Sequence, residues 1–269
     1  FGSTIDSDGA TARALTLTTG GATPTIRFNG VVGGTNPVGA IAITGALDLD
    51  AIIQKTSDSS AGATSLTVSG VSNLGANVNT SGIQTYTGAV TLSGADRTLT
   101  GSTITTNGTI VGGANSLTIT GNAVFGDATT DTVTGVKILS VSGNTTVHTN
   151  TITTSGTQTY GDNAASDTIT LGNSTTFTTT DSQITFNGTV NSEGSETNSL
   201  TLGVGSSEVE FNGAVGGGRT LNAIAITGAL DLNAAITNTV SLTVSGASNL
   251  GANVTASGNS QTYSGPVTL

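Results

Sequence analysis

The sequence lacks cysteine, methionine and tryptophan, and it is poor in charged, aromatic and proline residues. Without cysteine, the chain has no disulfide bond and no thiolate to offer a metal. Six basic residues stand against 16 acidic ones, which leaves no basic stripe for nucleic acid and no basic patch for a membrane surface. No apolar run reaches the length of about 18 residues that a membrane-spanning helix needs, so we expect no membrane insertion.

Glycine and threonine are abundant instead, with 39 and 55 of the 269 positions. Three prolines are too few for a collagen or polyproline fibre. The mean hydropathy of +0.14 and the many β-branched side chains argue against a disordered chain. The absence of cysteine also fits export through a cell envelope, so we expect an extracellular or cell-surface location.

The chain repeats itself at long range, which is the strongest signal in the sequence. Residues 1–17 match residues 186–202 without a gap, and a shorter copy lies between them. We therefore interpret residues 1–269 as one continuous segment of a longer array. Its related units are 1–105, 106–185 and 186–269, the last of them truncated.

Within each unit, apolar residues alternate with threonine over four to six positions, as in Leu66-Thr-Val68 and Leu117-Thr-Ile119. This period of two places apolar side chains on one face of a strand and hydroxyls on the other. The runs end in glycine or Asn-Gly, and no capped helical pattern occurs. The prediction is an all-β fold, a parallel β-solenoid (β-helix) with about 20–25 residues per coil. The crossover rule favours a right-handed coil. The rival fold, a tandem array of β-sandwich domains, fits the missing tryptophan and the unit lengths poorly.

A Gln-Thr-Tyr motif marks each unit and ends at Tyr86, Tyr160 and Tyr263. These rings are the largest side chains available to fill a narrow core. Because alternate residues of a strand share a face, we expect Tyr86 on the buried face together with Val90 and Leu92.

Acidic residues with glycine nearby make three loops candidates for calcium, which takes several oxygen ligands from loops. No spacing matches an EF-hand or a glycine-aspartate nonapeptide repeat. The candidate ligands form three pairs: Asp6 with Asp8, Asp127 with Asp131, and Asp162 with Asp167.

Other polar residues have simpler interpretations. The sole histidine, His148, aligns with glycines of the other units, so we predict an exposed turn residue and no catalytic base. The pairs Asp48 with Asp50 and Glu208 with Glu210 are interpreted as solvated surface acids. Four Thr-Ile-Thr triplets recur at irregular intervals, which indicates outward-facing strand threonines and no flat ice-binding surface: 103–105, 118–120, 151–153 and 168–170.

The segments 66–78 and 80–92 carry a resemblance to known proteins. They read LTVSGVSNLGANV and TSGIQTYTGAVTL. Their pattern, rich in threonine, glycine and asparagine, resembles the β-strand-repeat regions of large bacterial surface proteins and filamentous-haemagglutinin-like adhesins. The resemblance implies secretion and a role as a stalk or fibre, and it brings no catalytic residues with it.

The functional expectation is an extracellular structural and adhesive β-solenoid, a stiff rod, fibre or cell-surface stalk, with no enzymatic activity and no cofactor. Its expected partners are copies of itself, end to end or side by side, and surface glycans or cell receptors. One alternative is a calcium-ordered module that binds glycans or a receptor. A more remote alternative is a β-helix polysaccharide depolymerase, which would need a dense cluster of acids and bases.

Overall fold

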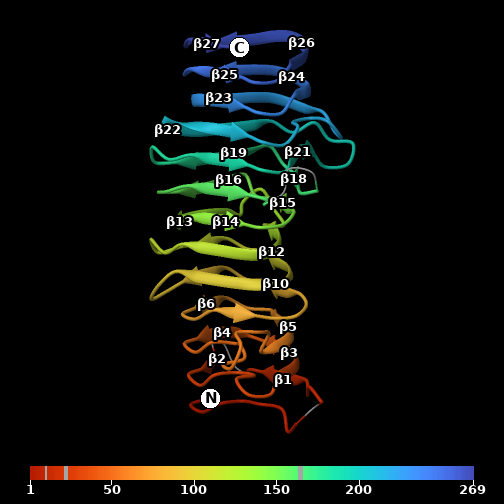
Figure 1. Cartoon of the computed structure of the whole chain (residues 1–269). Helices are drawn as coiled ribbons and strands as arrows, with labels where there is room; N and C mark the ends of the chain where they lie inside the picture. The colour runs from red at the N-terminus through yellow and green to blue at the C-terminus, as the bar shows by residue number, and fades with distance from the viewer. Residues whose placement is uncertain (10, 21–23, 163–165) are drawn as a thin grey trace.

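The structure is a computed structural model that describes residues 1–9, 11–20, 24–162 and 166–269 (Figure 1). In these ranges all regular secondary structure is β, and the chain winds into a β-solenoid of about 11 turns. Strand pairing between coils is parallel throughout these ranges. Figure 1 shows the coils stacked one above another with the two termini at opposite ends. The described part of the chain contains no helix long and apolar enough to cross a membrane.

Each coil contributes to three parallel sheets, which form the three sides of the solenoid. The first sheet contains β1 (Leu15–Thr18), β3 (Val38–Thr44), β5 (Ala63–Val68), β8 (Gln84–Tyr86), β15 (Thr145–Val147), β18 (Thr168–Leu171) and β21 (Thr189–Ser192). The second contains β2 (Thr25–Phe28), β4 (Ala46–Leu49), β6 (Ser72–Leu74), β9 (Val90–Leu92), β11 (Ile110–Val111), β13 (Thr132–Val136), β16 (Thr151–Thr154) and β19 (Thr175–Thr179). The third contains β7 (Val78–Asn79), β14 (Leu139–Val141), β17 (Gln158–Tyr160), β20 (Ile184–Phe186), β25 (Ser248–Leu250) and β27 (Val267–Thr268).

Longer strands turn a corner and belong to two sheets. β10 (Arg97–Thr106) and β12 (Leu117–Phe125) run from the third sheet onto the first. β22 (Leu200–Phe211) and β23 (Leu221–Leu232) run from the second onto the third. β24 (Ile236–Val244) and β26 (Val254–Tyr263) run from the first onto the second.

Coil length varies while the register between sheets is kept. Leu66 pairs with Ile41, 25 residues earlier, and with Gln84, 18 residues later. The variation lies in the corner loops, so inserted loop residues leave the pairing intact. The predicted parallel solenoid is confirmed.

The alternating pattern produces the core as expected. In β16, Ile152 is buried between half-buried threonines, and the same alternation recurs along most strands. Aromatic rings stack from coil to coil in the core: the ring centroids of Tyr160 and Phe186 lie 5.3 Å apart, and those of Phe186 and Phe211 lie 5.2 Å apart. Phe177 meets Tyr160 edge-on. Such ring pairs stabilise the core beyond the area that they bury.

The Gln-Thr-Tyr motif forms a buried polar clasp. The Tyr160 hydroxyl donates to Gln158 Oε1 at 2.9 Å, and Gln158 Nε2 donates to the carbonyl of Thr178 in the next coil at 2.9 Å. Tyr86 and Gln84 repeat this arrangement, and Tyr86 is fully buried together with Val90 and Leu92, as predicted.

The three Gln-Thr-Tyr motifs lie on three different sheets. Tyr86 belongs to the first sheet, Tyr160 to the third and Tyr263 to the second. Equivalent residues of the sequence repeat therefore occupy different sides of the solenoid.

Glycines stack at the corners, because successive coils approach too closely there for a side chain. The amide of Gly70 donates to the carbonyl of Gly45 at 3.0 Å, and a Cβ on Gly70 would lie 2.6 Å from that carbonyl. A Cβ on Gly88 would likewise lie 2.6 Å from the Gly70 carbonyl. Another stack, with similar clearances, contains Gly228, Gly246 and Gly265.

Candidate functional site

Across the described ranges, no three histidine, aspartate or glutamate side chains come together in a way that could hold a metal ion. Each predicted acidic pair has its own surroundings.

The first calcium candidates make hydrogen bonds and an ion pair within the protein. Asp6 Oδ1 accepts the backbone N–H groups of Thr35 and Asn36 at 2.8 and 3.1 Å, which ties the first loop to the following coil. Asp8 pairs with Arg13 at 3.3 Å on the open surface. Both carboxylates thus contribute to loop structure.

The other two pairs close their own loops. Asp131 Oδ2 accepts the N–H groups of Asp127 and Ala128 at 3.2 and 3.1 Å. Asp167 Oδ2 accepts the N–H of Asp162 at 2.9 Å. In each loop the carboxylate at the C-terminal end accepts an N–H from a residue three to five positions earlier, a local side-chain to backbone hydrogen bond. Calcium at these loops stays a prediction.

Asp48 belongs to a polar row across the outer face of the second sheet. It accepts from Arg27 Nε at 2.6 Å and from Asn73 Nδ2 at 2.8 Å, while Asp50 lies 3.3 Å from the same guanidinium. The hydrogen bond that Arg27 donates to Asp48, followed by the charges of Asp48 and Asp50, raises the pKa of Arg27. Asp50 is a surface acid as predicted, whereas the Asp48 side chain is only 15% exposed, and both carboxylates are paired with the Arg27 cation.

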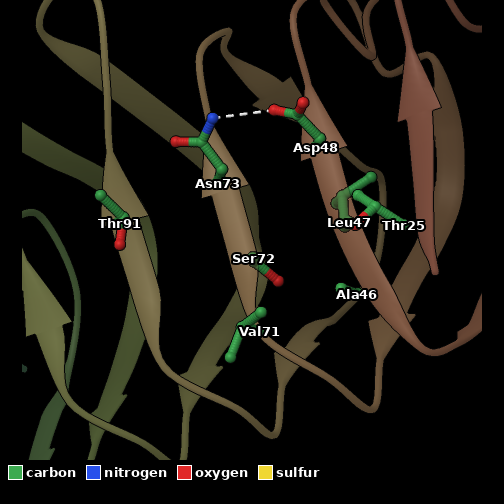
Figure 2. Close-up of a pocket in the computed structure, with 8 residues that line it drawn as sticks. All are labelled: Thr25, Ala46, Leu47, Asp48, Val71, Ser72, Asn73 and Thr91. Carbon is green, nitrogen blue, oxygen red and sulfur yellow. Dashed lines mark hydrogen bonds between the residues drawn. The ribbon is translucent and has the colours of Figure 1, made fainter. Parts of the chain in front are cut away.

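A shallow trough of about 280 Å³ runs beside this row (Figure 2). Asp48, Asn73 and Thr91 line one side of it, and Ala46 and Val71 line the other. The trough is open to solvent and holds one carboxylate that is already hydrogen bonded, so it offers no nucleophile with an adjacent base.

Glu208 and Glu210 lie on the outer face of the third sheet. Gln183 Nε2 donates to both carboxylates, at 3.0 and 3.3 Å, and Thr185 Oγ1 donates to Glu210 at 3.3 Å. The pair is solvated and supported by neutral donors, in agreement with its interpretation as surface acids.

His148 lies at a corner, as predicted, but it is half-buried and has a partner. Its Nε2 lies 3.1 Å from Glu193 Oε2, and the ring covers Gly172, where a Cβ would come within 2.1 Å of it. The expectation of an exposed turn residue is corrected on this point. Glu193 follows His148 by 45 residues and two coils, and only the coil register brings the two together.

The Thr-Ile-Thr triplets do not share a face. Residues 103–105 and 168–170 lie on the first sheet, 118–120 on the third and 151–153 on the second. The four triplets alone therefore make no continuous surface.

A few buried hydroxyls have no partner among the described residues, and sequence reasoning missed them. They point into the core from strands whose equivalent positions are apolar, and they belong to Ser72, Thr145 and Ser248. Because each is enclosed by the core, none is accessible to a ligand.

Comparisons with protein-family models, with curated proteins and with solved structures found no match to this chain.

Proposed function

We propose that this chain is a structural element, a stiff β-solenoid segment of an extracellular rod, fibre or cell-surface stalk with adhesive sides. The observation that supports this most directly is the continuous parallel pairing along the stack, from the bridge of Ile5 with Val32 to the pairing of β25 with β27. Such a stack places every interstrand hydrogen bond along the long axis.

The packing favours a load-bearing role. Coils about 4.8 Å apart give some 50 Å of rod over about 11 turns. Each coil contacts only its neighbours, so stability increases as coils are added. A pull along the axis is resisted by the hydrogen bonds of all three sheets together. Side-chain hydrogen bonds between coils, such as that from Gln158 to the Thr178 carbonyl, add to this resistance.

The outer surface supports weak, repeated contacts. It consists mainly of threonine, serine and asparagine side chains, which can donate to and accept from glycan hydroxyls. Copies of the same protein, end to end or side by side, are the partners that we propose, because exposed strand edges pair with further β-structure.

Electron microscopy of the protein isolated from its natural source tests this proposal. Filaments or cell-tethered rods with an axial repeat of about 4.8 Å would support it. Dispersed particles with no rod attached to a cell or matrix would overturn it. Polysaccharide cleavage by the purified chain would instead favour the depolymerase alternative.

A further inference from the structure

Outward threonines follow one another in register along the second sheet in the C-terminal half of the solenoid. From β13 onward this sheet presents a column of residues paired coil to coil, which contains threonine at six of its seven positions. In order, the column is Thr132, Thr151, Thr176, Thr201, Ala225, Thr243 and Thr262.

A second column runs beside the first, two residues further along each strand. Thr153 pairs with Thr178, which pairs with Gly203, which pairs with Thr227. Together the two columns form what we call the threonine face, defined by the threonines at 132, 151, 153, 176, 178, 201, 227, 243 and 262. Figure 1 shows its strands β16, β19 and β22 lying one above another and nearly parallel.

The face is regular although the sequence intervals are not. Consecutive positions of the first column differ by 18 to 25 residues, because the corner loops differ in length. The strand register removes these differences and leaves two spacings, about 4.8 Å between coils and about 6.6 Å between alternate residues of a strand.

The hydroxyls of the threonine face are free to bind. Among the described residues, none of them has a hydrogen-bond partner in the protein. The first sheet also carries outward threonines in register, such as Thr146 and Thr170, but asparagines interrupt the column beside them. In that column Thr168 Oγ1 donates to Asn144, and Thr189 Oγ1 donates to the Asp167 carbonyl.

The strand segments that carry the threonine face contain no charged residue, although the chain carries a net charge of −10. Glu208 and Glu210 lie on the third sheet, and Asp48 and Asp50 lie at the other end of the second. Asp131 precedes Thr132 at the edge of the face. The threonine face is therefore a rigid lattice of unpaired hydroxyls and methyls without charge.

From this arrangement we infer that the threonine face binds ice. Hydroxyls at fixed positions hold water molecules by hydrogen bonds, and the methyl groups beside them leave that water few other protein contacts. The two spacings of the face lie close to the oxygen repeats on a prism face of ice. The water that it orders therefore joins the crystal without rearrangement.

Two other occupants fit the face less well. Glycan sites generally need aromatic, amide or carboxylate side chains for direction and stacking, and the threonine face has none. Pairing with a second copy would bury on the order of 300 Å² per chain from these spacings, well below the ~800 Å² per partner of stable complexes. An ice surface needs no such area, because every matched coil adds a contact to the same crystal.

To test this inference, ice is grown slowly from a solution of the full 269-residue chain. The concentration of protein in the ice is then compared with its concentration in the remaining liquid. Thermal hysteresis of the same samples is recorded. The variant Thr201→Lys disrupts the middle of the threonine face, and Thr146→Lys is its matched control, an outward threonine on β15 of the first sheet. Circular dichroism melting of each variant confirms that it is folded.

We expect the parent chain and Thr146→Lys to enter the ice and to show hysteresis, and Thr201→Lys to lose more than half of both signals. No enrichment in ice for the folded parent overturns the inference, and so does an equal loss in the two variants. Dimerisation or glycan binding through this face without ice binding also overturns it. The rod proposal does not depend on the result.

Discussion

Thr145 shows how a single atom affects this fold. Its side chain is fully buried, and its hydroxyl has no partner among the described residues, while the equivalent positions in adjacent coils are Ala123 and Ile169. A buried hydroxyl without a hydrogen bond costs about 1–3 kcal/mol. The position would therefore be more stable with a methyl group.

We expect Thr145→Val to raise the free energy of unfolding by about 1 kcal/mol, because it removes an unpaired polar atom at nearly constant volume. Denaturant unfolding monitored by circular dichroism measures the change. The matched control is Thr175→Val, since the Thr175 hydroxyl is also buried but donates to the Thr149 carbonyl at 3.0 Å. That variant should lose stability, and equal effects in the two variants would contradict the argument.

The tyrosines give a residue-scale prediction in alkali. Burial raises the pKa of Tyr86 and Tyr160 well above 10. Burial also raises the pKa of Tyr263, but this side chain lies in the last coil and is less enclosed. A phenol whose pKa is higher in the folded state stabilises the fold fully below its unfolded pKa of about 10 and progressively less as the pH rises above that.

In a spectrophotometric titration from near-neutral to strongly alkaline pH, we expect Tyr263 to ionise first and reversibly. Tyr86 and Tyr160 should ionise only together with loss of the β-sheet circular dichroism signal. Three equivalent ionisations in a chain that stays folded would contradict the buried clasps. Tyr263→Phe provides the assignment of the first step.

At the scale of the element, the corner glycines set how closely coils can stack. We expect Gly70→Ala to destabilise the protein by about 1–3 kcal/mol, because its Cβ would overlap the Gly45 carbonyl and force two coils apart. The control Gly203→Ala lies in β22, where the nearest atom is a Thr178 methyl at 3.6 Å, and it should be nearly neutral. Thermal melting compares the two, and equal melting temperatures would refute the steric explanation.

The acidic loops form another element-scale test. The Asp131 and Asp167 carboxylates already accept backbone N–H groups, and no third acid joins either pair among the described residues. We therefore expect millimolar calcium, compared with a chelator, to leave the melting temperature unchanged. A rise with calcium would instead support the calcium-ordered module, since a ligand of the folded state stabilises it.

Strands and corners are easier to predict from the sequence than which strands lie side by side. The alternation of Leu66-Thr-Val68 and the glycines after it indicate a strand and a corner, because both depend on residues close in sequence. The pairing of Leu66 with Gln84 depends on how many residues the corners absorb, and no local pattern specifies that number. For the same reason His148 gave no indication of Glu193.

At the scale of the whole molecule, the stack should lose structure from its ends. A solenoid coil is stabilised mainly by its two neighbours, and an end coil has only one. We expect hydrogen exchange to be fastest in β1 and β26 and slowest in central strands such as β14 and β17. Mass spectrometry of peptic fragments measures this gradient, and uniform protection across all coils would indicate a single all-or-none unit.

The placement of the three Gln-Thr-Tyr motifs on three different sheets has a consequence for how such a chain evolves. Because equivalent segments fold as well on one side as on another, a duplicated stretch of gene need not encode a whole number of turns. Unequal crossing-over can add or remove strands and leave a continuous core. Each such event also rotates the downstream surface about the axis, so a lineage can change what each side displays without inventing a new sequence.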